Sequence, residues 1–326
     1  MTGVLVPAPT EADWLAARRE GITASEIAVV MGLSPFDSPF ALYHRKRGDL
    51  AAVEDNDAMR IGRHLESLVC KMFAERRPEF HLLGDGRALY AHESRPWQMA
   101  TPDRIVYEST GYPSVWDAPA AVLEAKTAAT YDGWGDDGTD EIPVHYRCQV
   151  LWQMDVLGLD AAFVACLFIH SRKLRVYELA MDDSARNDLA LLREAGQEFT
   201  RQVAGGEEPD VDWRPATGDA LRHLNQGVEQ RDVTVRPQLA RSYRAAVRRY
   251  RDAEQRKDLM TNRMLQAIGT GRRALDQAGR PVATRSVYPN RRIDTGKLRE
   301  SYPDAAAACT VTKDVTKLLP AKGDKS

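Results

Sequence analysis

The spacing of apolar residues predicts that helices and short strands follow one another along the first two hundred residues. The clearest helical pattern covers residues 57–76, where an apolar stripe indicates packing against a core: Ile61, Leu65, Leu68, Val69 and Phe73. After Pro78 the pattern changes to short β-type runs separated by turn-rich pieces. We predict strands over residues 80–84, 88–93, 99–108 and 120–128, a strand pair over residues 161–180, and further helices over residues 12–20, 25–31, 144–157 and 183–205.

A shift in composition divides the chain into two predicted parts. We place a core at residues 1–208 and an extension at residues 209–326. In the extension, residues 237–269 have apolar side chains at roughly helical spacing and arginines on the other faces, which predicts one long helix. A hairpin is predicted to follow over residues 272–288, and a disordered tail over residues 318–326.

The composition is that of an ordinary soluble globular protein, with 326 residues, 43% hydrophobic and 28% charged. No apolar run reaches the roughly 18 residues that a membrane-spanning helix needs, and the first residues lack the pattern of a signal peptide. We therefore expect a cytoplasmic protein that has no membrane partner. The cysteines form no C-x-x-C pair, so we expect reduced and mostly buried thiols rather than a zinc site or disulfides: Cys70, Cys148, Cys166 and Cys309.

Charge is distributed unevenly along the chain. The formal net charge is −2, yet residues 231–300 contain 18 Lys and Arg against 7 Asp and Glu. A basic segment of this kind often approaches phosphate groups, but a solvated helix face has the same composition. The sequence leaves these two interpretations open.

The stretch LEAKTA, residues 123–128, places Glu124 and Lys126 on one side of a predicted strand, because side chains alternate along a strand. Asp103 begins the preceding strand, so a hairpin would bring Asp103 and Glu124 together. Two close carboxylates favour Mg²⁺, which would activate a water, while Lys126 would hold the nucleophile or offset transition-state charge. That chemistry suits phosphodiester hydrolysis. A strand with one solvent-facing side has the same short pattern, so the pattern alone does not decide.

Further motifs stand in the order found in a known family. The sequence supplies TPDRI around Asp103, LEAKT around Lys126, GRHLE ending in Glu66, and HYRCQVLWQMDVLG containing Gln149. Over about residues 14–204 the chain resembles the PD-(D/E)XK nuclease superfamily and, within it, the lambda exonuclease or YqaJ-type viral recombinase family. The resemblance implies a metal site of Asp103, Glu124 and the Ala125 carbonyl, a catalytic Lys126, and supporting roles for Glu66 and Gln149. Gln153 lies one helical turn further on and is the alternative to Gln149.

The opening stretch WLAARREGITASEIA also resembles this family. The family's arginine and serine in this segment contact the 5′-phosphate of DNA, which implies that role for Arg18 and Ser25. A guanidinium, a hydroxyl and the N-terminus of a helix form a suitable phosphate receptor. Alone, the TASE motif is equally explained by a capping box between Thr23 and Glu26, with a helix from about Ser25.

Together these observations predict an α/β (α+β) fold with a restriction-endonuclease-like core, in which helices flank a central mixed β-sheet, followed by a basic helical extension. The predicted function is Mg²⁺-dependent degradation of linear double-stranded DNA from a 5′-phosphorylated end, which leaves single strands for phage-type recombination. Mn²⁺ is expected to substitute for Mg²⁺, and no iron–sulfur cluster is expected. The family implies duplex DNA ends and a single-strand annealing protein as partners, allows a homo-oligomer, and places a phage-encoded member in the host cytoplasm.

Two other functions remain open from the sequence. The first is an endonuclease of the same superfamily, a restriction or repair enzyme, which would also cut closed circular DNA. The second is a non-catalytic DNA-binding module on a nuclease scaffold. The intact set of Asp103, Glu124 and Lys126 disfavours the module, because a degenerate site has no need for close like charges.

Overall fold

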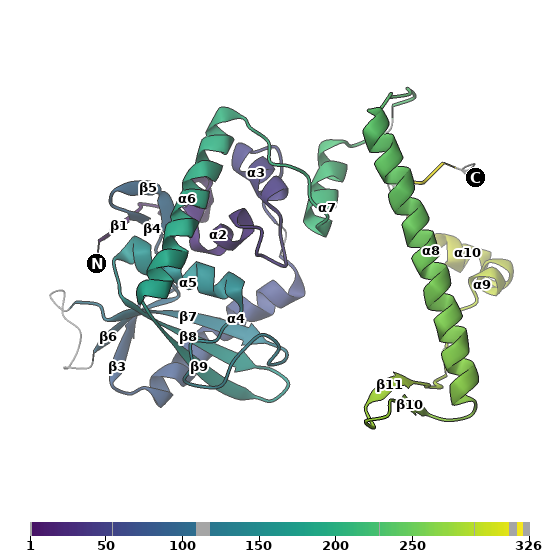
Figure 1. The fold of residues 1–326 in the computed structure, drawn as a ribbon. Helices are drawn as coiled ribbons and strands as arrows, with labels where there is room; N and C mark the ends of the chain where they lie inside the picture. Colours follow the sequence, from purple (N-terminus) through teal and green to yellow (C-terminus); the bar gives the residue numbers. More distant parts are fainter. Residues whose placement is uncertain are drawn as a thin grey trace. The chain divides into compact units, whose positions relative to one another are not determined.

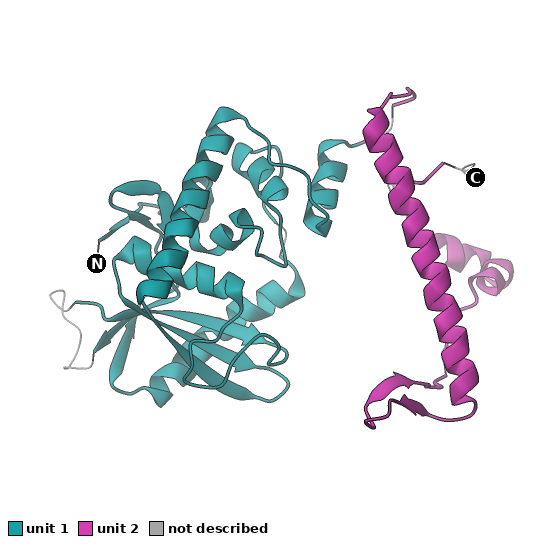
Figure 2. Ribbon diagram, in the orientation of Figure 1, with its two compact units in different colours: residues 1–226 teal, residues 227–326 magenta. Residues whose placement is uncertain are grey.

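The structure is a computed structural model, and it describes residues 2–53, 55–108, 118–227, 229–289, 291–312 and 318–321. The chain forms two compact units, a first unit of residues 1–226 and a second unit of residues 227–326 (Figure 2). The first unit therefore ends later than residue 208, where the composition shifts. The reason is helix α7 (Pro215–Leu224), whose Ala220 packs with Phe40 and Ala41 of helix α3 (Pro39–Arg47).

A five-stranded mixed sheet forms the centre of the first unit. Its strand order is β3–β6–β7–β8–β9, and every neighbouring pair is antiparallel except β7 and β8, which are parallel. The parallel pair requires a crossover, and helix α5 (Val144–Leu157) provides it. The strands cover Phe80–Leu83 (β3), Arg104–Glu108 (β6), Ala121–Ala128 (β7), Ala161–Phe168 (β8) and Lys173–Ala180 (β9).

Helices cover both faces of this sheet (Figure 1). On one face, helix α4 (Asp57–Arg76) packs through Val69 and Phe73 against β7 and β8. On the other face lies α5, which is almost wholly buried from Val150 to Leu157. The predicted apolar stripe of α4 is only partly core: Ile61 is 54% exposed and Leu68 is 45% exposed. The buried residues of α4 all lie in its C-terminal half, so the prediction that the whole stripe packs against a core was wrong for these two positions.

A second, smaller sheet has the order β1–β4–β5–β2, and its two outer strands come from the beginning of the chain. Its short strands cover Gly3–Leu5 (β1), Ile22–Thr23 (β2), Tyr90–His92 (β4) and Arg95–Ala100 (β5). Trp152 of α5 is fully buried, and its indole N–H donates to the carbonyls of Ile22 (3.2 Å) and Met99 (3.1 Å). A single side chain thus joins α5 to both β2 and β5.

Local signals account for several helix ends. Helices α1 (Glu11–Arg19) and α2 (Ala24–Val30) flank the predicted break at Gly21. Gly158 ends α5 with φ 63°, a left-handed conformation that glycine adopts without strain. Asp182 caps α6 (Asp183–Gly205), because its carboxylate accepts from the Ala185 backbone N–H at 2.7 Å.

Three of the four cysteines are buried, as the sequence predicts. Cys70, Cys148 and Cys166 are free and buried, and Cys309 is free and exposed. Burial raises the pKa of the Cys70 thiol to about 12, as expected for a small apolar residue that does no chemistry. None of the helices in the described residues has the length and apolar character needed to cross a membrane.

The second unit consists of one long helix with smaller elements attached. Helix α8 runs from Pro237 to Ile268 and has no buried residue. The predicted hairpin follows as β10 (Arg273–Leu275) and β11 (Pro281–Thr284), and two short helices come after it, α9 (Thr295–Ser301) and α10 (Pro303–Ala308). Most of the predicted β6–β7 connection, residues 109–117, and most of the predicted disordered tail lie outside the described residues.

Candidate active site

The strands β6 and β7 bring the two predicted metal-binding carboxylates together. Arg104 pairs with Leu123 in the antiparallel register, so Asp103 and Glu124 come next to each other where β6 begins. Strand β7 continues past this point, and the backbone N–H of Ala125 donates to Asp103 Oδ2 at 2.7 Å. The Asp103 side chain therefore takes the place that a strand partner would occupy. The predicted pairing of these two strands is confirmed.

Glu124 lies at the centre of a buried hydrogen-bond network. Its side chain is 4% exposed, and its Oε1 accepts from Lys126 Nζ and from Gln149 Nε2, both at 2.6 Å. Its Oε2 accepts from Gln153 Nε2 at 2.7 Å. Gln149 and Gln153 therefore both face the site, one helical turn apart on α5. The sequence left open which of the two reaches the site, and the structure shows that both do. Leu123 points the other way, into the core under α4.

Lys126 is held by three groups. Its Nζ donates to Glu124 and also to Gln149 Oε1 (3.1 Å), and it lies 4.7 Å from the ring centre of Tyr146. The Tyr146 ring is itself packed between His145 and Trp134, with ring centres at 4.0 and 5.5 Å. Burial disfavours the Lys126 ammonium, but the carboxylates of Glu124 and Asp103 outweigh it and raise its pKa. The charged ammonium thus stands in one position without substrate.

When Asp103 and Glu124 are both ionised, their two negative charges exceed the single positive charge of Lys126. Burial raises the pKa of Asp103 well above its ordinary value, and the neighbouring Glu124 carboxylate raises it further. A hard cation between the two carboxylates would remove this repulsion. Mg²⁺ accepts such a donor set, because it binds through one or two carboxylates and keeps several waters. In the described ranges, no group of three or more His, Cys, Asp or Glu side chains is arranged to hold a metal ion.

Glu66 lies beside the site but is engaged in an ion pair. Its Oε1 accepts from Arg104 Nη1 at 3.0 Å, and Arg104 directly follows Asp103. Gly86 makes room for it, because a Cβ at that position would lie 2.9 Å from Glu66 Oε1. Arg104 is not among the site residues predicted from the sequence. In the sequence, the only indication of this role is that a basic residue directly follows Asp103.

The predicted phosphate receptor forms a compact cluster at the start of α2. Arg18 Nη2 donates to Thr23 Oγ1 and Ser25 Oγ, both at 3.3 Å, and its guanidinium lies 4.3 Å from the ring centre of Trp14. Burial lowers the pKa of Arg18, and Glu26 opposes this effect. Thr23, which the sequence suggested only as a cap, is therefore a third polar group of the cluster.

Glu26 and Lys46 stabilise the cluster through further hydrogen bonds. Glu26 Oε2 accepts from the Thr23 backbone N–H (2.9 Å), as a capping box requires. The side chain of Lys46, 4% exposed, donates to Glu26 (2.7 Å) and to the carbonyls of Arg18 (2.7 Å) and Gly21 (2.6 Å). The capping interaction and the cluster coexist, so one does not exclude the other.

Strand β5 links the cluster to the carboxylates. Thr23 pairs with Met99 in the parallel register of β2 and β5, and Asp103 follows four residues later. Four residues of extended chain span at most about 14 Å. The backbone of Asp103 therefore lies within about 14 Å of Met99, the strand partner of Thr23.

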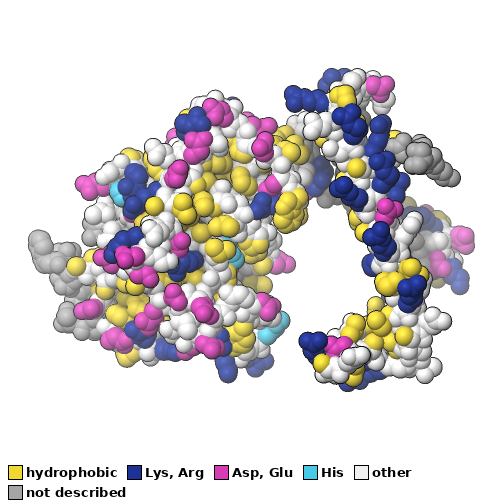
Figure 3. Space-filling view, in the orientation of Figure 1, with side chains coloured by type: hydrophobic (Ala, Val, Ile, Leu, Met, Phe, Trp, Pro, Cys, Tyr) yellow, Lys and Arg dark blue, Asp and Glu magenta, His cyan; other side chains and the backbone are white. Residues whose placement is uncertain are grey.

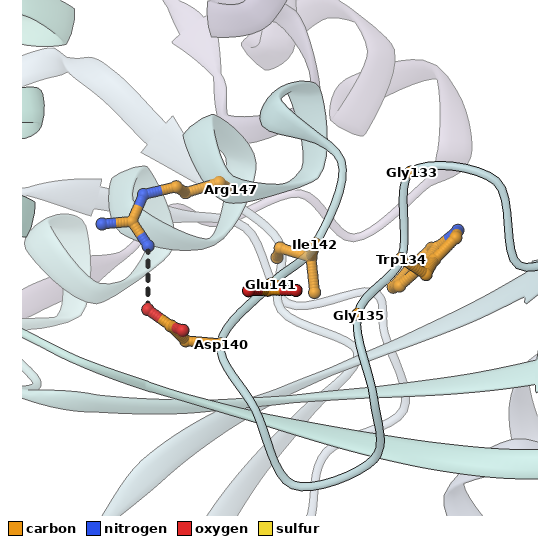
Figure 4. Close-up of a pocket in the computed structure, with 7 residues that line it drawn as sticks. All are labelled: Gly133, Trp134, Gly135, Asp140, Glu141, Ile142 and Arg147. Carbon is orange, nitrogen blue, oxygen red and sulfur yellow. Dashed lines mark ion pairs between the residues drawn. The ribbon is translucent and has the colours of Figure 1, made fainter.

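The pocket formed by the β7–α5 connection is a different feature. It has a volume of about 480 Å³ and is lined by Gly133, Trp134, Gly135, Asp140, Glu141, Ile142 and Arg147 (Figure 4). Arg147 pairs with Asp140 (3.8 Å) and with Asp188 on α6 (3.2 Å). No candidate active-site residue lines this pocket. Its contribution is indirect, because Trp134 packs on Tyr146 beside Lys126.

Residues 13–160 match the model of the YqaJ-like viral recombinase domain. All the candidate site residues lie within this segment, from Arg18 to Gln153. A protein of Bacillus subtilis (strain 168), uncharacterized protein YqaJ, is 26% identical over 303 residues, which cover 90% of this chain and 88% of that protein. The similarity therefore extends into the second unit.

Two solved structures are similar to the chain. One is an alkaline exonuclease, LHK-Exo, from Laribacter hongkongensis, with 19% identity, a TM-score of 0.45, and coverage of 60% of this chain and 93% of that one. The other is a phage related exonuclease from Haemophilus somnus 129PT, with 11% identity, a TM-score of 0.40, and coverage of 57% and 96%. Residues 13–160 are thus similar to the YqaJ-like viral recombinase domain, and the motifs of the candidate active site lie within this segment.

Proposed function

We propose that this protein is a Mg²⁺-dependent exonuclease that degrades linear double-stranded DNA from 5′-phosphorylated ends and leaves single strands for phage-type recombination. The observation that carries the proposal is the convergence of Asp103, Glu124 and Lys126 at the junction of β6 and β7. The family match supports a nuclease, and the geometry of these three side chains suits phosphodiester hydrolysis.

Asp103, Glu124 and the Ala125 carbonyl would hold the cation, for which Mn²⁺ can substitute. The bound cation would supply Lewis-acid stabilisation and a water of lowered pKa. Gln149 and Gln153 keep the Glu124 carboxylate in one orientation by donating to its two oxygens. Glu66 has a supporting role through Arg104, the residue next to Asp103.

Lys126 would orient the attacking water and offset the charge that develops on the phosphate oxygens. Its ammonium is already positioned by Glu124, Gln149 and the Tyr146 ring, so little reorganisation is needed when substrate arrives. This pre-organisation is what distinguishes a catalytic lysine from one on a solvated strand face.

Arg18 and Ser25 would bind the terminal 5′-phosphate, with Thr23 as an additional hydroxyl donor. The chain path through β5 keeps this cluster within a short reach of Asp103, as a substrate fixed at its end requires. An anchor for the terminal phosphate favours cutting at ends over cutting within a strand, and it sets the 5′ to 3′ direction. Single strands left by the reaction would pass to an annealing protein.

The first experiment is digestion of a blunt linear duplex that carries either a 5′-phosphate or a 5′-hydroxyl, with Mg²⁺ or with EDTA. We expect Mg²⁺-dependent loss of the phosphorylated duplex and much slower loss of the hydroxylated one. The Lys126→Ala protein should be inactive. The Lys71→Ala protein, which removes an exposed lysine of α4, should retain full activity.

A closed circular duplex in the same assay separates the other functions. Rapid nicking of the circle would replace the proposal by an endonuclease. Intact substrates under all conditions, with DNA still bound, would replace it by a binding module.

A further inference from the structure

Helix α8 carries a one-sided set of arginines that the proposed active site does not use. The helix has 32 residues, which corresponds to about 48 Å of length, and its residues are all at least partly exposed. In the space-filling view, Lys and Arg side chains follow its length (Figure 3). We define the arginine face of α8 by six residues: Arg241, Arg248, Arg249, Arg251, Arg256 and Arg263.

The helical repeat places these six arginines together. At about 100° per residue they fall within an arc of about 160°, in which Asp252 is the one acidic side chain and Leu259 the one large apolar one. The opposite side carries Tyr243 and Tyr250 together with other apolar residues: Leu239, Val247, Met264 and Ile268. The six arginines and the two tyrosines therefore lie on different sides of this helix.

Within the part of the chain that the structure describes, the arginines of this face differ from most other arginines because they form no ion pair with an acidic side chain. In the first unit, Arg193 is paired with Asp155, Arg104 with Glu66 and Arg45 with Asp37. Among the described residues, none of the six arginines forms an ion pair, although Asp252 and Glu254 are near in sequence. Six like charges on one rigid helix repel one another, so an external polyanion would stabilise them.

We propose that the arginine face of α8 binds the sugar–phosphate backbone of duplex DNA over about one helical turn. From Arg241 to Arg263 the face spans about 33 Å, close to the roughly 34 Å of one turn of B-DNA. The choice of DNA as the polyanion rests on the proposed function. The net charge of the second unit favours binding of a polyanion, because the unit contains 22 Lys and Arg against 11 Asp and Glu. The first unit has an excess of acidic residues.

Duplex DNA fits this face better than the single-stranded product. Proteins that hold single strands combine positive charge with aromatic side chains on which bases stack. The two tyrosines of α8 lie on the side away from the arginines, so a strand that follows the arginine face meets no ring. A duplex presents only its backbone to such a face and needs no stacking partner.

The test measures how salt changes binding of the full chain to a 30-base-pair duplex with 5′-phosphates, by fluorescence anisotropy. Lys126→Ala is present in every protein and EDTA in every sample, so the DNA stays intact. The test variant is Arg248→Gln/Arg249→Gln/Arg256→Gln, because glutamine is nearly as good a helix former as arginine. The slope of log K against log salt should become shallower by about 2.7, which is three released phosphate contacts.

The matched control removes three arginines that already have acidic partners, Arg222→Gln/Arg231→Gln/Arg280→Gln. It makes the same change in net charge and should leave the slope within about one unit of the parent value. Equal slopes for both triple variants would overturn the proposal, and so would a larger loss of affinity for a 30-nucleotide single strand than for the duplex. Circular dichroism confirms that α8 remains helical.

The outcome is separable from that of the proposed function. If the chain digests 5′-phosphorylated duplex but the arginine variant keeps the parental slope, only the arginine-face proposal fails. If the chain cuts no DNA and the arginine variant still loses the salt dependence, the exonuclease proposal fails and the DNA-binding face stands.

Discussion

The two units of this protein carry net charges of opposite sign, and they differ in how deeply the charged groups are buried. The first unit contains 23 Lys and Arg against 36 Asp and Glu, and the second contains 22 against 11. In the first unit, the central carboxylate Glu124 is buried and bonded to three side chains. In the second unit, the arginine face of α8 is open to solvent.

This difference follows from what each kind of site requires. A cation site needs carboxylates in fixed positions, which only a packed sheet and its covering helices provide. A surface for a polyanion needs positive charge along a length, which one exposed helix provides without a core. Under the two proposals made above, a single chain would combine a net-acidic catalytic unit with a DNA substrate, because the positive charge is on a separate unit.

The largest expected effect separates catalysis from binding. Glu124→Gln keeps the size of the side chain but removes its charge, so activity on linear duplex should fall by about 10³-fold. Duplex binding in EDTA should keep the parental salt dependence. Measuring activity and duplex binding on one preparation tests whether catalysis and DNA binding belong to different units. A parallel loss of binding would show that the two units do not act separately.

The next largest effect concerns stability. Phe73 is fully buried under the sheet, and Phe73→Ala should lower the free energy of unfolding by about 3–5 kcal/mol. Tyr250 of α8 is 68% exposed, and Tyr250→Ala should change it by less than about 0.5 kcal/mol. Urea unfolding followed by circular dichroism measures both. Similar costs for the two variants would mean that the tyrosine side of α8 is covered in solution.

A smaller effect is expected from the residues that orient Glu124. Gln153 is completely buried and donates to Glu124 Oε2, so Gln153→Leu should reduce activity by about 10- to 100-fold. Gln266→Leu, the same replacement at an exposed position of α8, should leave activity unchanged. Initial rates at saturating Mg²⁺ provide the measurement. An active Gln153→Leu protein would reduce this glutamine to a packing role.

The smallest effect is a pH dependence of stability. Burial disfavours the Asp155 carboxylate, but hydrogen bonds from Arg193 and Gln98 outweigh it and lower its pKa. The folded pKa lies below the unfolded one, so this stabilisation is present above about pH 4 and is lost as the pH falls through the folded pKa. Asp155→Asn should cost about 1–3 kcal/mol at pH 7 and little at acidic pH.

Asp276 in the hairpin of the second unit is the matched comparison. Its pKa is also lowered, by hydrogen bonds from the Arg280 backbone and side chain. Its side chain is 29% exposed, against 8% for Asp155, so Asp276→Asn should have a weaker effect than Asp155→Asn at pH 7. Thermal unfolding between pH 3 and pH 7 checks the pair, and equal effects would contradict the distinction between buried and partly exposed carboxylates.

The sequence alone determined those features that depend on short-range geometry. Side-chain alternation is local, so LEAKTA already placed Glu124 and Lys126 on one side of a strand. The same holds for the end of α5 at Gly158, where a left-handed conformation is needed, and for α8, whose helical spacing runs for 32 residues.

Tertiary structure decided which side chains contact the same partner and which lie on the same face of the core. Gln149 and Gln153 both reach Glu124 because the packing of α5 on the sheet sets its rotation, which helical periodicity does not specify. The pairing of Arg104 with Glu66 joins residues 38 positions apart. The exposure of Ile61 and Leu68 depends on where the core under α4 ends. Alternation and capping are determined within a few residues of chain, whereas these contacts form only when distant elements pack together.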